Sequence, residues 1–303
     1  MKKLVLCLVL LSTQVFADTQ IEAERLYKAR GEKKENTLSA AKIYEDLANT
    51  TTDEREKGLL LIKQSQSLYY YGGLISSKNQ KKSNYIKAYT AAKKAISLLS
   101  ASKGVPKTNV SNSELALAHY FYAINLARWG QANGISSSIR KLPELMRNLN
   151  LVSKLDASVE DFGALRTTGR TKHKVPKTLA RLMGLKKFGK DDAMDDLFRA
   201  YDETLVYVEE LDVEISRNST TVVYLLDVLA DLEERGDFCE IYRAAKAVAN
   251  ASDEVLATIN PSQVPEAKTN YRNLLACVAD EDKCEAGDFQ SGDDLTDLAR
   301  SCR

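Results

Sequence analysis

The sequence predicts an all-helical fold in which pairs of helices stack into a curved α-solenoid. Apolar residues recur at three- and four-residue intervals along most of the chain, as they do on one face of an α-helix. The 303 residues include only 5 prolines, and alternating β-branched runs are scarce, so strands have little support. Short turns that contain glycine, such as Gly72–Gly73 and Gly236, separate neighbouring helices.

Each predicted helix combines an apolar stripe with a start or stop signal. Asp53 is a suitable N-cap for the third helix, and Gly72–Gly73 follows its last turn. A short helix or loop, basic wherever it is charged, is expected over Pro176–Gly189. The other predicted helices cover residues 19–30, 37–48, 54–71, 83–99, 113–129, 136–151, 159–169, 191–211, 220–235, 238–251 and 266–279.

The rest of the chain is organised around the stretch Ser113–Pro176. It opens with Ser113 as the expected N-cap of a strongly apolar helix. That helix ends on the only tryptophan, Trp129, immediately before Gly130. Nothing in this stretch has the pattern of a catalytic motif.

Two neighbouring segments around Gly236 have the sequence pattern of a helical hairpin. Large residues form the seam of the first helix, small residues face it from the second, and the turn between them is short: Leu225, Val228, Leu229 and Leu232 against Ala244 and Ala247. This is the pattern of tetratricopeptide-type hairpins. A similar small-residue face, which close helix packing demands, is formed by Ala88, Ala92 and Ala95. The corresponding alanines Ala40 and Ala88 are 48 residues apart, longer than the usual repeat of about 34. We therefore expect degenerate hairpins that must stack to bury their apolar faces.

The first residues predict export. Met1–Lys3 is a short positive region, Leu4–Leu11 is an apolar run, and Val15–Phe16–Ala17 has the small residues that a signal peptidase reads. We expect cleavage after Ala17, a periplasmic or secreted protein, and no lipoprotein processing at Cys7. The expected organisation is a signal peptide over 1–17, one helical domain over 18–280, and an extended acidic tail over 281–303.

Charge is strongly segregated along the chain. Residues 18–190 carry 31 Lys/Arg against 15 Asp/Glu, whereas residues 191–303 carry 10 against 27. Either each half has a solvated face of one sign, or the opposite halves meet within one chain or between chains. The lysines are spread over many helix faces without a nucleic-acid-binding motif, so nucleic acid is not an expected partner.

The cysteines agree with export. Once the leader is removed, four remain, which predicts two disulfides: Cys239, Cys277, Cys284 and Cys302. Three pairings are possible. Antiparallel helices that place Cys239 and Cys277 at the same end favour Cys239–Cys277, with Cys284–Cys302 holding the tail. No Cys-x-x-Cys pair occurs, so a metal site is not expected.

Residues Ala118–Gly130, AHYFYAINLARWG, carry a resemblance to a known family. They are similar to the central helix of the T-component (TatT-type) family of tripartite ATP-independent periplasmic (TRAP) transporters, and Gly169–Arg170 followed by Lys174–Pro176 resembles a second segment of that family. The resemblance implies a non-enzymatic periplasmic helical protein, often trimeric. Its groove or channel would hold a small or hydrophobic ligand beside a substrate-binding partner subunit. The cysteine-bearing tail and the missing lipobox depart from many members.

The aromatic residues near Trp129 are the first candidates for a ligand surface. Three consecutive aromatics cannot all face one way on a helix, and the alternative is that they pack between helices. Asn125, a polar residue on an apolar helix, suits either a groove or an interhelical hydrogen bond. The groove candidates are Tyr120, Phe121, Tyr122, Asn125 and Trp129. The aromatic run Tyr69–Tyr71 either lines the same wall or simply ends its helix.

A basic run predicts an anion-binding or partner-binding site. No acid occurs between Phe162 and Lys190. Its candidates are Arg166, Arg170, Lys174 and Arg181, because guanidinium groups grip carboxylates with two hydrogen bonds. The alternative is a solvated face or a contact to an acidic neighbour. The two histidines, His119 and His173, have no partner at metal-ligand spacing, so structural roles are expected.

These observations predict a non-enzymatic periplasmic accessory protein, without a cofactor, that resembles a TRAP T component. An apolar groove near Trp129 would shelter a small molecule, and the basic segment would orient an acidic group or a partner, either a TRAP-type substrate-binding protein or another envelope protein. The alternative is a tetratricopeptide-type scaffold that binds a polypeptide in the cell envelope. No nucleophile motif, phosphate loop or dinucleotide fingerprint is present, so enzyme activity is not expected.

Overall fold

A computed structural model describes residues 16–287 and 289–302. The predicted leader, residues 1–17, lies outside these residues except for its last two positions. Where the sequence predicted one domain over 18–280, the contacts divide the chain into an N-terminal unit, Met1–Asp156, and a C-terminal unit, Ala157–Arg303. Each unit is described by itself.

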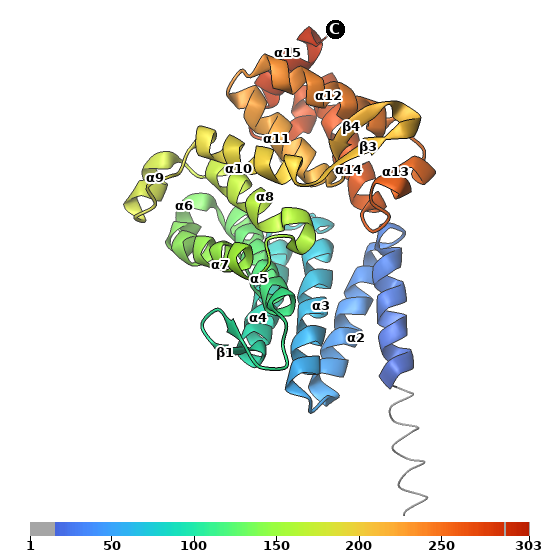
Figure 1. The fold of residues 1–303 in the computed structure, drawn as a ribbon, viewed down its shortest axis with the longest axis vertical. Helices are drawn as coiled ribbons and strands as arrows, with labels where there is room; N and C mark the ends of the chain where they lie inside the picture. The colour runs from blue at the N-terminus through green and yellow to red at the C-terminus, as the bar shows by residue number, and fades with distance from the viewer. Residues whose placement is uncertain (1–15, 288, 303) are drawn as a thin grey trace, which may run out of the picture. The chain divides into compact units, whose positions relative to one another are not determined.

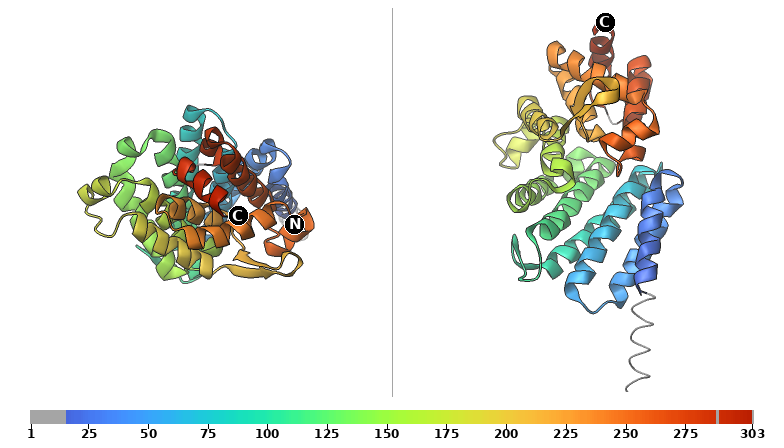
Figure 2. Two further views of the ribbon diagram at one scale, coloured as in Figure 1. Left: turned by 90° about the horizontal axis from the view of Figure 1, so that it is seen from above. Right: turned by 45° about the vertical axis from the view of Figure 1, so that its right-hand side comes forward.

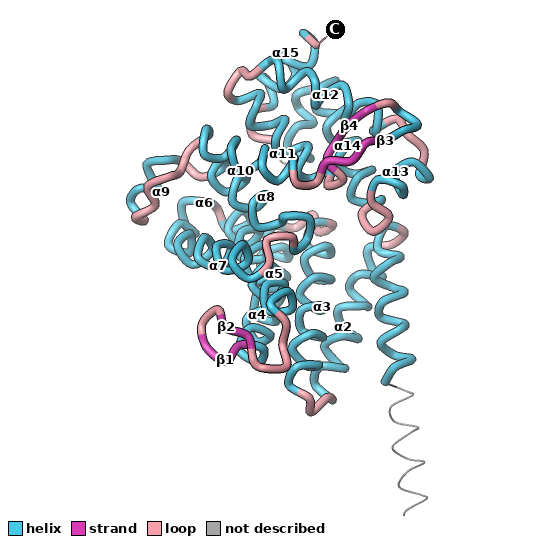
Figure 3. The backbone as a smooth tube through the Cα atoms, viewed as in Figure 1, coloured by secondary structure: helices cyan, strands magenta, loops and turns pink. Residues whose placement is uncertain are grey.

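The all-α class is confirmed, and strands are confined to two short hairpins in the described residues (Figure 3). None of the helices in this part of the chain combines the length and apolarity that crossing a bilayer requires.

The N-terminal unit is a row of antiparallel helices in which each packs on the next (Figures 1 and 2). A helix over residues 16–28 leads into the elements η1 (Ala29–Gly31), α2 (Lys34–Thr50), α3 (Glu54–Gly73), α4 (Lys78–Leu99), β1 (Ser100–Ser102), β2 (Val105–Pro106), α5 (Asn112–Asn133), α6 (Ile135–Ser138), η2 (Ile139–Lys141) and α7 (Leu142–Leu155). Sequential packing is what stacked hairpins require, while the repeat geometry itself stays a prediction.

Small residues let these helices approach closely, as the sequence predicted. Ala40, Ala88, Ala92 and Ala95 are all fully buried. Asp53 caps α3 as predicted, because its side chain accepts a hydrogen bond from the Glu56 amide.

The N-cap of α5 is Ser111, so the prediction of Ser113 is wrong. The Ser111 hydroxyl accepts from the Glu114 amide, and the Glu114 carboxylate accepts from the Ser111 amide. This reciprocal pair satisfies two backbone donors that the helix leaves free, whereas the Ser113 hydroxyl donates to Asp156 instead.

We expect Ser111→Ala to lower the stability of the N-terminal unit by about 1 kcal/mol, because the cap is lost. Ser113→Ala, the matched control, should change stability by less than about 0.5 kcal/mol. Denaturant unfolding followed by the fluorescence of Trp129 measures both. Equal losses for the two serines would contradict the assignment of the cap.

The C-terminal unit surrounds one helix that is buried on nearly every side. Its elements are α8 (Val159–Lys174), α9 (Lys177–Leu182), α10 (Lys190–Asp202), β3 (Leu205–Val208), η3 (Glu209–Leu211), β4 (Val213–Ser216), α11 (Ser219–Asp231), α12 (Arg235–Ala249), α13 (Asp253–Ile259), α14 (Val264–Ala279), η4 (Glu281–Gly287) and α15 (Gly292–Ser301). The central helix, α11, packs against α10, α12, α14 and α15. This position explains why its sequence is apolar almost all round.

The helix predicted over 191–211 ends at Asp202, and a β-hairpin follows it. β3 and β4 pair antiparallel, with Val206 opposite Ile215, and Asp212 adopts a left-handed conformation in the turn. The physical reason is the alternation of β-branched residues from Val206 to Ile215, which favours strands.

The tail predicted as extended contains α15, and the favoured disulfide pairing is wrong. The bonds are Cys239–Cys302 and Cys277–Cys284. α15 packs on α12 and so brings Cys302 to Cys239, while Cys277 near the end of α14 meets Cys284 in η4. The buried side chain of Leu295 holds the tail in the core of the unit.

Candidate functional site

Most of the predicted groove residues on α5 are core residues of the N-terminal unit. Tyr120, Phe121 and Tyr122 are no more than 5% exposed, and the first two rings meet edge to face at 5.3 Å. Asn125 is fully buried and donates to the Ser65 hydroxyl on α3 at 3.1 Å. The aromatic rings therefore pack between helices, and Asn125 makes an interhelical hydrogen bond, as the alternatives to a groove proposed.

Trp129 differs from these residues because it is only half-buried. Its indole meets the Tyr89 ring of α4 edge to face at 6.3 Å, and Tyr89 in turn meets Tyr122 at 6.1 Å. Partly exposed aromatic rings of this kind can still contact a ligand.

Further aromatic rings are held against arginines in the same unit. The Arg30 guanidinium lies over both the Tyr27 and Tyr70 rings, at 4.9 and 5.0 Å from their centroids. The Arg128 guanidinium lies 6.0 Å from the Tyr69 ring, which packs on Tyr70 at 5.3 Å. Such stacking orients both partners and contributes about 0.5–2 kcal/mol per pair.

We call Tyr27, Arg30, Tyr69, Tyr70, Tyr89, Arg128 and Trp129 together the aromatic cluster. It consists of two sets of contacts, one that includes Arg128 and one formed by Tyr89 and Trp129, and the two sets are linked because Arg128 and Trp129 are consecutive on α5. Every member except Arg30 is half-buried. Sequence reasoning found Trp129 and considered Tyr69–Tyr71, but missed both arginines. The spacing of Tyr27 and Arg30, three residues apart on one helical turn, is the signal that could have found one of them.

The four residues of the predicted anion site do not form one site. Arg166 is buried, and its guanidinium donates to the carbonyls of Glu160 and Asp161 at 3.0 Å. These residues begin α8 in a left-handed turn, with φ of 52° at both. Because L-residues adopt this conformation only at a cost, Arg166 stabilises a strained turn and is not available to a ligand.

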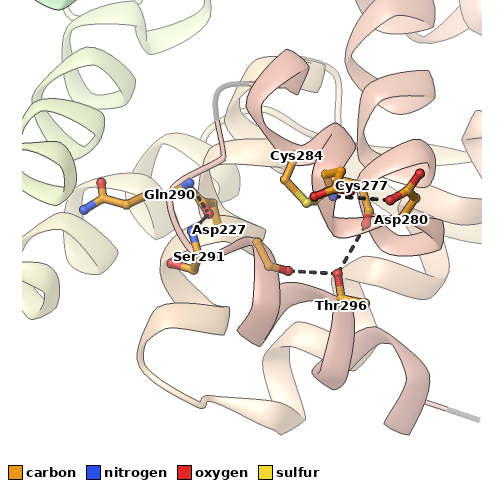
Figure 4. The surroundings of a disulfide bond; sticks show 9 residues. Asp227, Cys277, Asp280, Cys284, Gln290, Ser291 and Thr296 are labelled. Carbon is orange, nitrogen blue, oxygen red and sulfur yellow. Dashed lines mark hydrogen bonds between the residues drawn. A yellow bond between two sulfur atoms is a disulfide. The ribbon is translucent and has the colours of Figure 1, made fainter.

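Arg170 is buried in an ion pair with an acid far away in the sequence. Its Nη1 lies 2.5 Å from Asp227 Oδ2 on α11, and its guanidinium carbon lies 4.4 Å from the Tyr224 ring centroid. The amides of Gln290 and Ser291 also donate to the Asp227 carboxylate, at 2.9–3.0 Å (Figure 4). The contact to an acidic neighbour, an alternative left open by the sequence, is therefore present.

The other two predicted residues of that site are placed differently. Lys174 is half-buried at the end of α8, and Arg181 is exposed on α9. The basic run thus contains an inner part that takes part in folding and an outer part on the surface.

Both histidines are buried, and burial lowers the pKa of each. The His173 ring lies between Arg170, Asp227 and Asp231, and the two carboxylates oppose part of the lowering of its pKa. The Nδ1 of His119 lies 2.7 Å from Asn148 Oδ1, which places the proton on Nδ1. Each histidine is only 4% exposed, and Nε2 of His119 has no hydrogen-bond partner among the described residues.

We expect the protein to lose stability as the pH falls below about 6.5, the ordinary pKa of histidine. The unfolded chain takes up protons there while the folded histidines, whose pKa values are lowered, do not, so stability falls by at most about 1.4 kcal/mol per pH unit for each histidine. His119→Gln keeps a donor to Asn148 and should flatten the slope. Urea midpoints at about pH 7.5 and about pH 5 measure it; an unchanged slope in the variant would contradict this assignment.

A shallow hollow of about 260 Å³ lies in the C-terminal unit among α12, α13 and α14. Val248, Leu256 and Tyr271 supply its apolar wall, and Lys268 and Arg272 stand at its rim. Lys268 pairs with Asp253 at 2.5 Å. In the described part of the chain, no group of three or more His, Cys, Asp or Glu side chains is placed to hold a metal ion.

A scan of the chain against models of protein families gives no match, and neither does a search of curated proteins.

Proposed function

We propose that this chain is a non-enzymatic binding protein of the cell envelope that holds a small apolar organic anion at the aromatic cluster. The single observation that supports this is the arrangement of half-buried aromatic rings and stacked guanidinium groups in the N-terminal unit. Rings offer apolar faces to a ligand, and the guanidinium group of the half-buried Arg128 can attract a carboxylate or sulfonate. The two disulfides are compatible with an oxidising compartment.

The role as a T-component-like accessory of a TRAP-type transporter is part of this proposal. Its support is the resemblance over Ala118–Gly130. Most of that stretch is buried, so the likeness supports helix packing more directly than a ligand site. A substrate-binding partner subunit and a trimeric assembly belong to the same proposal.

Trp129 makes the ligand site directly testable, because it is the only tryptophan and belongs to the cluster. The probe is 1-anilinonaphthalene-8-sulfonate, an apolar aromatic anion that accepts energy from indole. We expect saturable binding with quenching of Trp129, weakened at least about tenfold by Tyr69→Ala and by Arg128→Ala.

Two controls make the experiment decisive. Tyr207→Ser removes an exposed tyrosine of the C-terminal unit and should leave probe binding unchanged. Arg272→Ala alters the hollow; a loss of binding in this variant alone would place the probe there and overturn the aromatic cluster as the site. Native mass spectrometry of the purified protein then asks whether a small molecule is retained. An empty protein that captures a single polypeptide would favour the scaffold alternative.

A further inference from the structure

The segment from Lys177 to Lys187, which we call the basic tip, comprises α9 and the loop after it. It carries four cations, Lys177, Arg181, Lys186 and Lys187, and no acid. All four are exposed, and none of their side chains makes an ion pair or hydrogen bond to a described residue. All views place α9 at the margin of its own unit (Figures 1 and 2).

Three cations that flank the basic tip are paired with acids, which sets the tip apart as a positive patch. Lys172 pairs with Asp196 at 2.7 Å, Arg170 pairs with Asp227, and Lys190 pairs with Asp231 at 2.7 Å. The folded unit therefore pairs part of the basic run with its acidic helices and leaves the charge of the tip free. The sequence alone could not separate these two groups.

The tip also exposes an apolar side chain among its cations. Leu182 is 75% exposed, more than any other large hydrophobic residue in the described chain. Gly184 ends the helix with φ of +80°, a conformation that suits glycine. Ala180 and Phe188 are buried and anchor the tip on both sides of Leu182.

We infer that the basic tip docks on an anionic phospholipid surface, with its cations at the headgroup phosphates and Leu182 among the acyl chains. Charge complementarity favours such a surface, since each Lys or Arg near anionic lipid contributes about a fivefold gain in binding. The basic tip, residues 177–187, is too small for a stable protein interface, which takes about 20–30 residues from each partner. A lipid surface needs no matching shape and accepts a protruding leucine.

The charge of the residues that follow the tip would orient the C-terminal unit on that surface. Residues 191–303 carry 10 Lys/Arg against 27 Asp/Glu, so anionic lipid repels them. Because charge attraction is screened by ions, docking through the tip is expected to be reversible and sensitive to salt.

The test uses the full, oxidised protein and sedimentation with vesicles. Phosphatidylcholine vesicles that contain phosphatidylglycerol should bind it, pure phosphatidylcholine vesicles should not, and added salt should release it. Neutralising the tip (Lys177→Gln, Arg181→Gln, Lys186→Gln and Lys187→Gln) should weaken binding at least about 100-fold. The matched control removes four exposed, unpaired lysines of the N-terminal unit: Lys63→Gln, Lys87→Gln, Lys94→Gln and Lys103→Gln. It should weaken binding no more than about fivefold.

The leucine is tested separately. Leu182→Ser should weaken vesicle binding about tenfold, whereas Ile86→Ser, which alters another exposed apolar residue, should not. In a Trp129→Phe background, the emission of Leu182→Trp should shift to the blue on anionic vesicles. Equal binding by the two four-site variants, or no spectral shift, would overturn the inference. Failure to bind vesicles together with saturable binding to polyglutamate would overturn it in favour of an acidic polypeptide.

Discussion

Replacing Asp227 with alanine is expected to destabilise the C-terminal unit by about 3–5 kcal/mol. The carboxylate is fully buried on α11 and accepts hydrogen bonds from Arg170 and from the amides of Gln290 and Ser291. Its removal leaves the Arg170 charge buried without its partner, and it leaves two backbone donors unsatisfied. The loss should exceed that of an ordinary surface substitution several-fold.

The measurement follows guanidinium chloride unfolding by two probes. Far-UV circular dichroism reports both units, whereas fluorescence reports only the N-terminal unit, because Trp129 is the single tryptophan. We expect part of the dichroism transition to move to lower denaturant. Asp297→Ala is the control, since that carboxylate is 79% exposed and pairs, among the described residues, with Arg300 alone; it should change stability by less than about 0.5 kcal/mol. An unfolding transition of Asp227→Ala that coincides with that of the wild-type protein would contradict the stabilising role of the buried Asp227 carboxylate.

Local sequence patterns were sufficient to predict most helices, because the residues that cap a helix and form its packing face lie within one or two turns of each other. The small-residue face of Ala88, Ala92 and Ala95 predicted close packing, and all three are fully buried. Asp53 was recognisable as a cap for the same reason. The hairpin formed by β3 and β4 was not predicted, although Val206 and Ile215 belong to an alternating pattern. Each strand has only 4 residues, and the periodicity of so short a run does not distinguish a strand from a helical turn.

Long-range partners could not be predicted from the sequence. Nothing near Arg170 indicates that its partner is Asp227, 57 residues away, so a buried ion pair was interpreted as a binding site. The burial of the aromatic residues of α5 could not be predicted from the sequence either. Periodicity shows that Tyr120 and Phe121 lie on a helix, but only the packing of α4 and α7 shows which rings remain accessible. Trp129 remains half-buried because it lies near the end of its helix.

The disulfide pairing gives a direct chemical test of the C-terminal unit. Trypsin cleavage after Arg243, Arg272, Lys283 and Arg300 puts the four cysteines on separate peptides. Without reduction, the peptide 236–243 should remain joined to 301–303, and 273–283 to 284–300. Recovery of 236–243 joined to 273–283 would instead support the pairing that the sequence favoured and would contradict the packing of α15 on α12.

The two disulfides should also differ in their effect on stability. Loop-closure entropy grows with the length of the closed loop, and the sequence separations are 63 residues for Cys239–Cys302 and 7 for Cys277–Cys284. We therefore expect a loss of about 4 kcal/mol for Cys239→Ser with Cys302→Ser, and about 2 kcal/mol for Cys277→Ser with Cys284→Ser. Far-UV circular dichroism in guanidinium chloride measures both, each variant serving as the control for the other. A greater loss of stability on removing Cys277–Cys284 would mean that native contacts of the tail, and not the entropy of the unfolded chain, account for most of the stabilisation. Such a contact is present, because Thr296 donates a hydrogen bond to the Cys277 carbonyl and so links this disulfide to α15.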